Sequence, residues 1–182
     1  MSLDIYLSSL PDNQYRKIAK QITPKKKVKS PLMSWEYFMM SYANSIEGIQ
    51  RSKDMASLKS LQSTHQWQED PANILSHEFD ALVLTDSKLV IEWVNPGFTD
   101  MTGYSSEFAI GKTPRFLQGK KTSEETRRHI REHIRLARPF KATVVNYRKD
   151  RGEYQCEINV FPLKSASGKV SHFLALETEV AA

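Results

Sequence analysis

The chain has 182 residues, of which 40% are hydrophobic and 26% are charged, and these proportions are typical of a globular protein. Its length allows one ordinary domain, or a small domain with an extension. The 26 basic residues exceed the 21 acidic ones by five, which permits a phosphate-bearing ligand, nucleic acid or an acidic membrane as partner without requiring any of them. A single cysteine, Cys156, excludes an internal disulfide and a cysteine-based zinc site.

Several other classes of protein are disfavoured by missing motifs. No apolar run approaches the ~20 residues that a membrane-spanning helix needs. The first residues, 1–4, lack the basic and apolar regions of a signal peptide, so we expect a cytoplasmic protein with no membrane partner. The pair His129 and His133 lacks the HExxH order, so no metal site is predicted there. No glycine-rich phosphate loop and no nucleophile elbow occur, so no enzymatic activity is expected.

Residues 1–31 are polar and contain a lysine run between Pro24 and Pro31. Such a segment is typical of a solvated tail or linker. The alternative is a nucleic-acid-binding arm. It is disfavoured because no arginine or aromatic residue alternates with the lysines.

Residues 32–70 are predicted to form a helical extension. Ser34 can cap a helix, and apolar residues then recur at spacings of three and four. Gly48 is a candidate break or bend in this run. The apolar face must pack against the next domain, its own second half or a second copy. It consists of Trp35, Phe38, Met39, Tyr42, Ile46, Met55, Leu58 and Leu61.

A third region, residues 73–180, has a different periodicity. A short helix is predicted over 74–79. Asn95-Pro96 starts a helix that Gly103 ends, an irregular helical stretch follows to Leu117, and Ser123 starts a helix that runs to about Leu136. Runs with strand character are expected over 81–85, 90–94, 140–148, 153–163 and 170–180. This order predicts an α+β domain, with a five-stranded antiparallel sheet and helices on one face.

Six segments of this region together resemble a PAS domain with its C-terminal PAC motif. The resemblance covers residues 73–180 and says nothing about residues 1–70. It implies a sensory signal-transduction module that senses a small ligand and contacts other proteins, without catalytic output of its own. The segments are Val83–Asp86, Val94–Phe98, Thr102–Ser105, Ile110–Gly119, Asn146–Asp150 and Gly168–Val170.

Within PAS domains, the run from Arg115 to Gln118 resembles the flavin-binding LOV branch. In that branch a cysteine forms an adduct with the excited flavin. Here Pro114 stands at the cysteine position and Thr113 at the neighbouring asparagine position. The alternative function is therefore a flavin-binding redox or light sensor that does not use the cysteine adduct.

Strand parity and the resemblance together suggest binding residues. Inward-facing positions of the last three strands line an apolar chamber between sheet and helices. By resemblance, a flavin there would be held by Thr113, Arg115, Gln118, Arg131, Asn146, Cys156 and Glu177, with the arginines near the phosphate. In the alternative, side chains fill the chamber and the arginines pair with Glu124, Glu125 or Glu132. The cofactor is thus left open between FMN or FAD and none, with haem or another small ligand a minor alternative.

The opposite face of the predicted sheet is too apolar to contact water. It carries Thr143, Val145, Tyr147, Phe161, His172, Leu174 and Leu176. We expect the N-terminal helical region to cover this face, either within one chain or across a two-fold axis. A homodimer through this face and the N-terminal helices is therefore predicted, together with an unidentified signalling partner. Nucleic acid is not expected as a partner.

Overall fold

The computed structural model describes residues 31–181, so the predicted tail over 1–31 lies outside the described residues apart from Pro31. The chain divides into two units, residues 1–48 and 49–182, and the second contains the sheet. The elements, in chain order, are α3 (Pro31–His65), α4 (Pro71–Ile74), β1 (Ala81–Asp86), β2 (Ile91–Val94), α5 (Pro96–Thr102), α6 (Ser106–Ala109), the 3-10 helix η1 (Pro114–Leu117), α7 (Glu124–Leu136), β3 (Phe140–Tyr147), β4 (Glu153–Lys164) and β5 (Val170–Val180).

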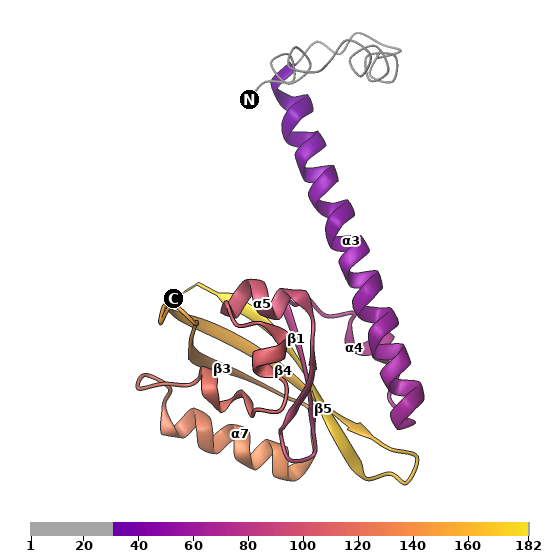
Figure 1. Cartoon of the computed structure of the whole chain (residues 1–182), viewed down its shortest axis with the longest axis vertical. Helices are drawn as coiled ribbons and strands as arrows, with labels where there is room; N and C mark the ends of the chain where they lie inside the picture. Colours follow the sequence, from indigo (N-terminus) through magenta and orange to yellow (C-terminus); the bar gives the residue numbers. More distant parts are fainter. Residues whose placement is uncertain (1–30, 182) are drawn as a thin grey trace. The chain divides into compact units, whose positions relative to one another are not determined.

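The five strands form one antiparallel sheet in the order β2-β1-β5-β4-β3 (Figure 1). The prediction of a five-stranded antiparallel sheet is confirmed, and the strands follow one another along the chain as expected. Residues 81–85 of β1 are buried throughout, so both faces of the sheet are covered at its centre. Register fixes which side chains share a face. Leu84 lies opposite Leu174, and Ile158 lies opposite Glu177.

The inner face is covered by the segment between β2 and β3, which contains α5, α6, η1 and α7. Helix α5 begins at Pro96 because the Asn95 side chain accepts a hydrogen bond from the Phe98 amide, and it ends at Gly103, whose φ of 74° is left-handed. The buried residues of this layer form one cluster with the sheet: Ala81, Val83, Ile91, Val94, Phe98, Met101, Ala109, Leu117, Tyr154 and Cys156.

The outer face is covered by residues of the same unit, from the end of α3 through α4. Leu58 is fully buried, and Met55 and Leu61 pack beside it. Their partners on the sheet include Leu174 and Leu176. The prediction that the helical extension covers this face is therefore confirmed for the C-terminal part of α3, within one chain.

Two local predictions need correction. The helix expected over 74–79 lies at Pro71–Ile74 instead. Asp70 is its N-cap and Pro71 suits its first turn, so the helix begins three residues earlier than expected. Gly48 neither breaks nor ends α3, which continues from Pro31 to His65.

Asn95 joins the two layers. Its side-chain oxygen accepts hydrogen bonds from the Leu82 and Phe98 amides at 2.8 and 3.1 Å. Its side-chain nitrogen donates to a carboxylate oxygen of Asp54, on α3, at 2.9 Å. Asp54 also accepts from Gln50 at 2.8 Å and is buried. One asparagine thus ties α3, β1 and the start of α5 together.

Candidate ligand cavity

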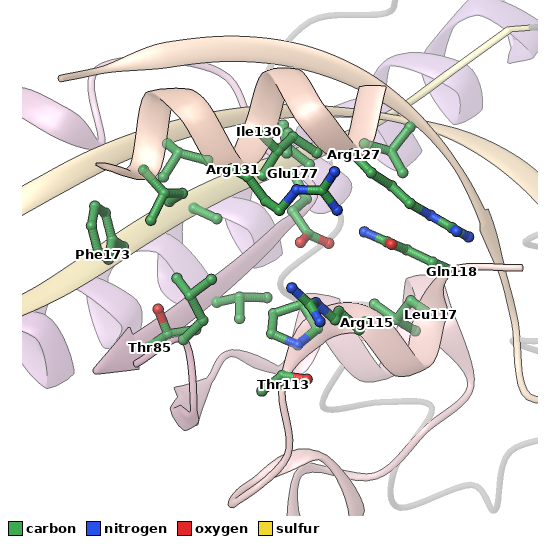
Figure 2. A pocket seen from close by; sticks show the side chains of 18 of the residues that line it. Thr85, Thr113, Arg115, Leu117, Gln118, Arg127, Ile130, Arg131, Phe173 and Glu177 are labelled. Carbon is green, nitrogen blue, oxygen red and sulfur yellow. The ribbon is translucent and has the colours of Figure 1, made fainter. Parts of the chain in front are cut away.

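A cavity of about 630 Å³ lies between the inner face of the sheet and helix α7. This volume falls within the range of small-molecule sites. Its walls are largely apolar, and polar groups enter it from η1, α7 and β5 (Figure 2). Asn146 of β3 also lines it. Among the apolar residues are Val83, Leu117, Ile130, Phe140, Val144 and Phe173.

Three arginines line one part of the cavity: Arg115 on η1, and Arg127 and Arg131 on α7. Arg131 pairs with Glu124 at 2.8 Å and Arg127 with the same carboxylate at 3.6 Å. The hydrogen bond from Arg131 lowers the pKa of Glu124. Among the described residues, Arg115 forms no ion pair with an acidic side chain. Beside these arginines the Glu124 carboxylate is the ion-pair partner of Arg127 and Arg131, and three guanidinium groups exceed it in charge, which suits an anion.

The loop after η1 is fixed to β3. The Thr122 hydroxyl donates to the Val145 carbonyl and accepts from the Gly119 amide at 3.0 Å. A Cβ at Gly119 would lie 2.2 Å from the Tyr147 ring, so the close approach requires glycine. As a result Gln118 pairs with Asn146 in an isolated β-bridge, and both residues line the cavity.

Several buried polar atoms of the cavity wall lack a partner. Among the described residues, four buried side-chain polar atoms have no hydrogen bond of normal geometry. Three of them belong to lining residues: the Thr85 hydroxyl, the Nε of Arg127 and the Oδ1 of Asn146. Buried polar groups in folded proteins are nearly always satisfied, so these three lining residues are the ones at which a further hydrogen-bond partner is expected.

Glu177 brings a carboxyl group to the same space from the centre of the sheet (Figure 2). Burial raises its pKa to about 7, and a weak hydrogen bond from the Cys156 thiol, 3.9 Å away, opposes the rise. Near neutral pH the group is partly protonated. A protonated carboxyl presents one donor and one acceptor, as a primary amide does.

Six of the seven predicted binding residues line the cavity, namely Thr113, Arg115, Gln118, Arg131, Asn146 and Glu177. The seventh, Cys156, is fully buried behind Glu177 and is absent from the cavity wall. Burial and the Glu177 charge raise the pKa of its thiol.

Sequence reasoning missed Arg127 and Thr85, which also line the cavity. Arg127 lies four residues before Arg131, so both share one face of α7 and the spacing could have identified it. The sequence places Thr85 at the end of a strand and in one of the segments that resemble a PAS domain, but nothing in it marks the hydroxyl as unpartnered.

Comparison with known proteins agrees with this geometry. The family model of the PAS domain matches residues 80–181. The chain belongs to the PAS family. It is 27% identical to the blue-light photoreceptor Aureochrome1 LOV in its light state, with a TM-score of 0.56 over 59% of this chain and 87% of that one. The LOV domain of an Erythrobacter litoralis blue-light activated histidine kinase is 28% identical, with a TM-score of 0.54 over 58% and 99%.

Curated relatives include sensors and regulators. Phototropin-2 of Oryza sativa subsp. japonica is 33% identical over 69% of this chain and 14% of its own length. A nitrogen fixation regulatory protein of Klebsiella oxytoca is 29% identical over 55% and 20%. A blue-light-activated histidine kinase of Brucella abortus is 30% identical over 53% and 19%.

The chain thus spans a fifth or less of the length of these relatives. Their shared PAS domain confirms the prediction of a sensory signal-transduction module. Among the described residues, no helix is both long enough and apolar enough to cross a bilayer.

Proposed function

We propose that this PAS domain senses a small phosphate-bearing molecule bound in the inner cavity, and passes its occupancy to a partner protein without catalysis of its own. A flavin nucleotide, FMN or FAD, is the ligand class that the LOV relatives favour. The observation that carries the proposal is the largely apolar cavity itself, which three arginines line and in which Glu124 is the ion-pair partner of two of them.

The residues of the cavity suit the two ends of such a ligand. Arg115, Arg127 and Arg131 would face the phosphate, where bidentate guanidinium contacts replace those to Glu124. Asn146 and Glu177 would hydrogen-bond the polar edge of the ring, and the apolar walls would contact its faces. When bound, a flavin supplies light absorption and one- or two-electron redox chemistry.

The proposed sensor does not use a cysteine adduct. Pro114 occupies the position that carries the reactive cysteine in LOV domains, and the one cysteine of the sequence, Cys156, lies behind Glu177. Its raised pKa keeps the thiol protonated, and a protonated thiol is a poor nucleophile. A response to light or redox state would therefore act through hydrogen bonds to the ligand.

The proposal is tested by titrating the full chain with FMN and following flavin fluorescence. Removing one charged hydrogen-bond donor costs about 1.5–3 kcal/mol, so Arg131→Ala should weaken binding by roughly 10- to 100-fold. Arg128→Ala is the matched control, because Arg128 is an exposed arginine of the same helix that does not line the cavity. Equal affinity of both variants and wild type, or no binding to wild type, would contradict the proposal.

We propose further that the chain signals as a homodimer through the N-terminal half of α3. Trp35, Phe38, Met39 and Tyr42 are each 46–57% exposed, and the first two rings stack at a centroid distance of 6.0 Å. The outer sheet face is already covered within one chain by Leu58 and its neighbours, which leaves this stripe for a second copy. Sedimentation should show a dimer that the double variant Trp35→Ala/Phe38→Ala converts to monomer, whereas Leu136→Ala, also at an exposed apolar residue, should leave the dimer intact.

A further inference from the structure

Three metal-ligating side chains meet on the outer side of the sheet, away from the cavity. His65 is the last residue of α3, Glu92 lies on β2, and His172 lies on β5. Among the described residues, this is the one group of three or more His, Cys, Asp or Glu side chains whose ligand atoms all lie within 4.8 Å of one another. The fold brings His65 and His172, which are 107 positions apart in sequence, to a ring-centroid distance of 4.2 Å.

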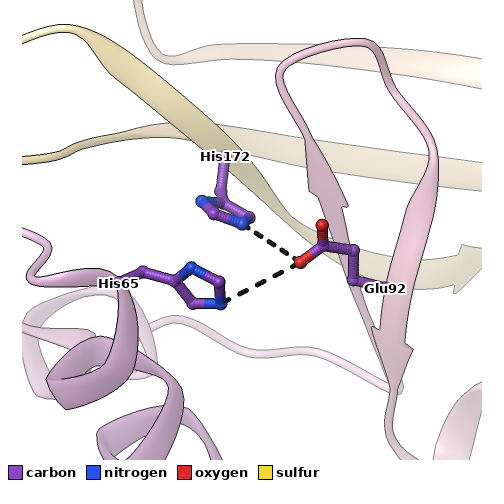
Figure 3. Close-up of side chains that lie close together, drawn as sticks. All are labelled: His65, Glu92 and His172. Atoms are coloured by element: carbon purple, nitrogen blue, oxygen red, sulfur yellow. Dashed lines mark hydrogen bonds and ion pairs between the residues drawn. The ribbon is translucent and has the colours of Figure 1, made fainter.

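The atoms point at a common space. The Nε2 of His172 lies 3.1 Å from a Glu92 carboxylate oxygen, and the Nε2 of His65 lies 4.0 Å from the same oxygen (Figure 3). Around a tetrahedral Zn²⁺ ion with bonds of about 2.0–2.2 Å, ligand atoms lie roughly 3.4 Å apart. The two distances to Glu92 lie on either side of this value, and all three ligand atoms lie within 4.8 Å of one another, so side-chain rotations would bring them onto one ion.

The surroundings also suit a bound ion. The side chain of His172 is 7% exposed and is held by the sheet, whereas those of His65 and Glu92 are 29% and 41% exposed and leave a path from solvent. Two imidazoles and one carboxylate are a ligand set of divalent first-row transition metals, and they leave a further position for water. Magnesium and calcium prefer oxygen ligands and are disfavoured.

We propose that His65, Glu92 and His172 bind one divalent transition-metal ion of the Zn²⁺ type, which fastens the end of α3 to strands β2 and β5. This site is independent of the proposed ligand of the inner cavity. Because the ion bridges the helix and the sheet, its binding stabilises the contact through which α3 covers the outer face.

Trp67, which is hydrogen-bonded to His172, provides a fluorescence signal for metal binding. The Trp67 indole donates to the Nδ1 of His172 at 3.0 Å, so a neutral His172 carries its proton on Nε2, toward Glu92. A metal at Nε2 needs that lone pair, so the proton must transfer through water to Nδ1. From there it can be donated to the Ser171 hydroxyl, 2.9 Å away. The indole then loses its acceptor, and Trp67 fluorescence should change.

The test uses the tag-free full chain after removal of metal with a chelator. Titration with ZnCl₂, followed by calorimetry and by elemental analysis after gel filtration, should give one equivalent bound. Co²⁺ should give visible absorption bands, and Mg²⁺ should not compete. His65→Gln and Glu92→Gln should each weaken Zn²⁺ binding by roughly tenfold or more. Even the loss of a residue that only hydrogen-bonds to a metal-ligating side chain lowers metal affinity by about 10–100-fold. The fluorescence change should disappear in Trp67→Phe.

Two controls separate this site from other histidines. The double variant His129→Gln/His133→Gln removes the other close pair, whose rings lie 4.1 Å apart on α7, and His77→Gln removes an exposed histidine. Both should bind Zn²⁺ as wild type does. The proposal is overturned if wild type takes up no Zn²⁺, if His65→Gln binds it unchanged, or if binding is lost with the α7 pair. In the first case the three residues form only a metal-free hydrogen-bonded group.

Discussion

The two faces of the sheet use the same strands for opposite purposes. On the outer face, Leu58, Trp67, Leu84, Leu163 and Leu174 are each at most 4% exposed and fill the space between helix and sheet. On the inner face, alternate residues of the same strands border a cavity of about 630 Å³. The outer face is therefore closely packed, whereas the inner face leaves a cavity, the one in which we propose that the ligand binds.

Unpaired polar groups follow the same division. The three lining residues with orphaned atoms and the buried carboxyl of Glu177 lie on the inner side. On the outer side, the buried polar group of Trp67 has His172 as its partner, and Asp54 has Gln50 and Asn95. Among the described residues, the unsatisfied buried side-chain atoms belong to Thr85, Arg127, Asn146 and Tyr154, and each such group lowers stability unless a partner is supplied.

The largest expected effect is on the filled face. Leu58→Ala removes a fully buried side chain from a closely packed layer, and such changes cost about 2–5 kcal/mol. Urea denaturation should show this loss in the free energy of unfolding. The control Leu136→Ala, at a residue that is 52% exposed, should stay within about 0.5 kcal/mol of wild type. A similar small loss for Leu58→Ala would mean that the end of α3 does not pack on the sheet.

On the cavity face, the sharpest prediction concerns pH. The pKa of Glu177 rises from 4.5 to about 7 on folding, which converts to about 3 kcal/mol. A raised pKa in the folded state contributes stability that is present below pH 4.5 and is lost as pH rises through 7. Glu177→Gln has no carboxyl group to ionise at this position, so it does not lose this stability. The free energy of unfolding of the variant minus that of wild type should therefore increase by about 3 kcal/mol between pH 4.5 and 8.

The matched variant for this experiment is Glu78→Gln, at an exposed glutamate. Its difference from wild type should stay nearly constant over the same range. If the curves of Glu177→Gln and wild type ran parallel between pH 4.5 and 8, the carboxyl would be solvated and the cavity would not be a low-dielectric site.

A smaller effect is expected where the two layers are joined. Asn95→Ala removes an N-cap, leaves the Leu82 amide without its acceptor and removes one hydrogen-bond donor to Asp54. Together these losses should lower the free energy of unfolding by about 2 kcal/mol. Ser105→Ala removes only the cap of the short helix α6 and should cost about 1 kcal/mol. Equal losses in thermal denaturation would show that Asn95 acts as a cap alone and does not couple α3 to the core.

The sequence predicts which strand residues face the cavity and which segment forms one of its walls. Alternation on β3, β4 and β5 placed Val144, Ile158, Phe173 and Glu177 inward, because a strand has a strict two-residue period. The motif from Arg115 to Gln118 located one wall of the cavity.

Other features depend on distances that no pattern encodes. His65, Glu92 and His172 come from three elements, and only the folded sheet brings them together. In the sequence nothing distinguishes Asp54 from the other polar residues of its helix, yet Asp54 is 2% exposed and accepts a hydrogen bond from Asn95. Cys156 shares the inward parity of its neighbours but lies behind Glu177, because depth along a face is not given by periodicity.

The most direct test of the account is the ligand that the protein carries when purified from cells. The absorption spectrum of the native full chain, followed by mass spectrometry of the small molecules released on denaturation, reports it. A flavin nucleotide, or another phosphate-bearing compound present at about one per chain and absent from Arg131→Ala, is the predicted result. A chain that releases no such compound, and that binds none when FMN is added in excess, would contradict the claim that the inner cavity is a ligand site.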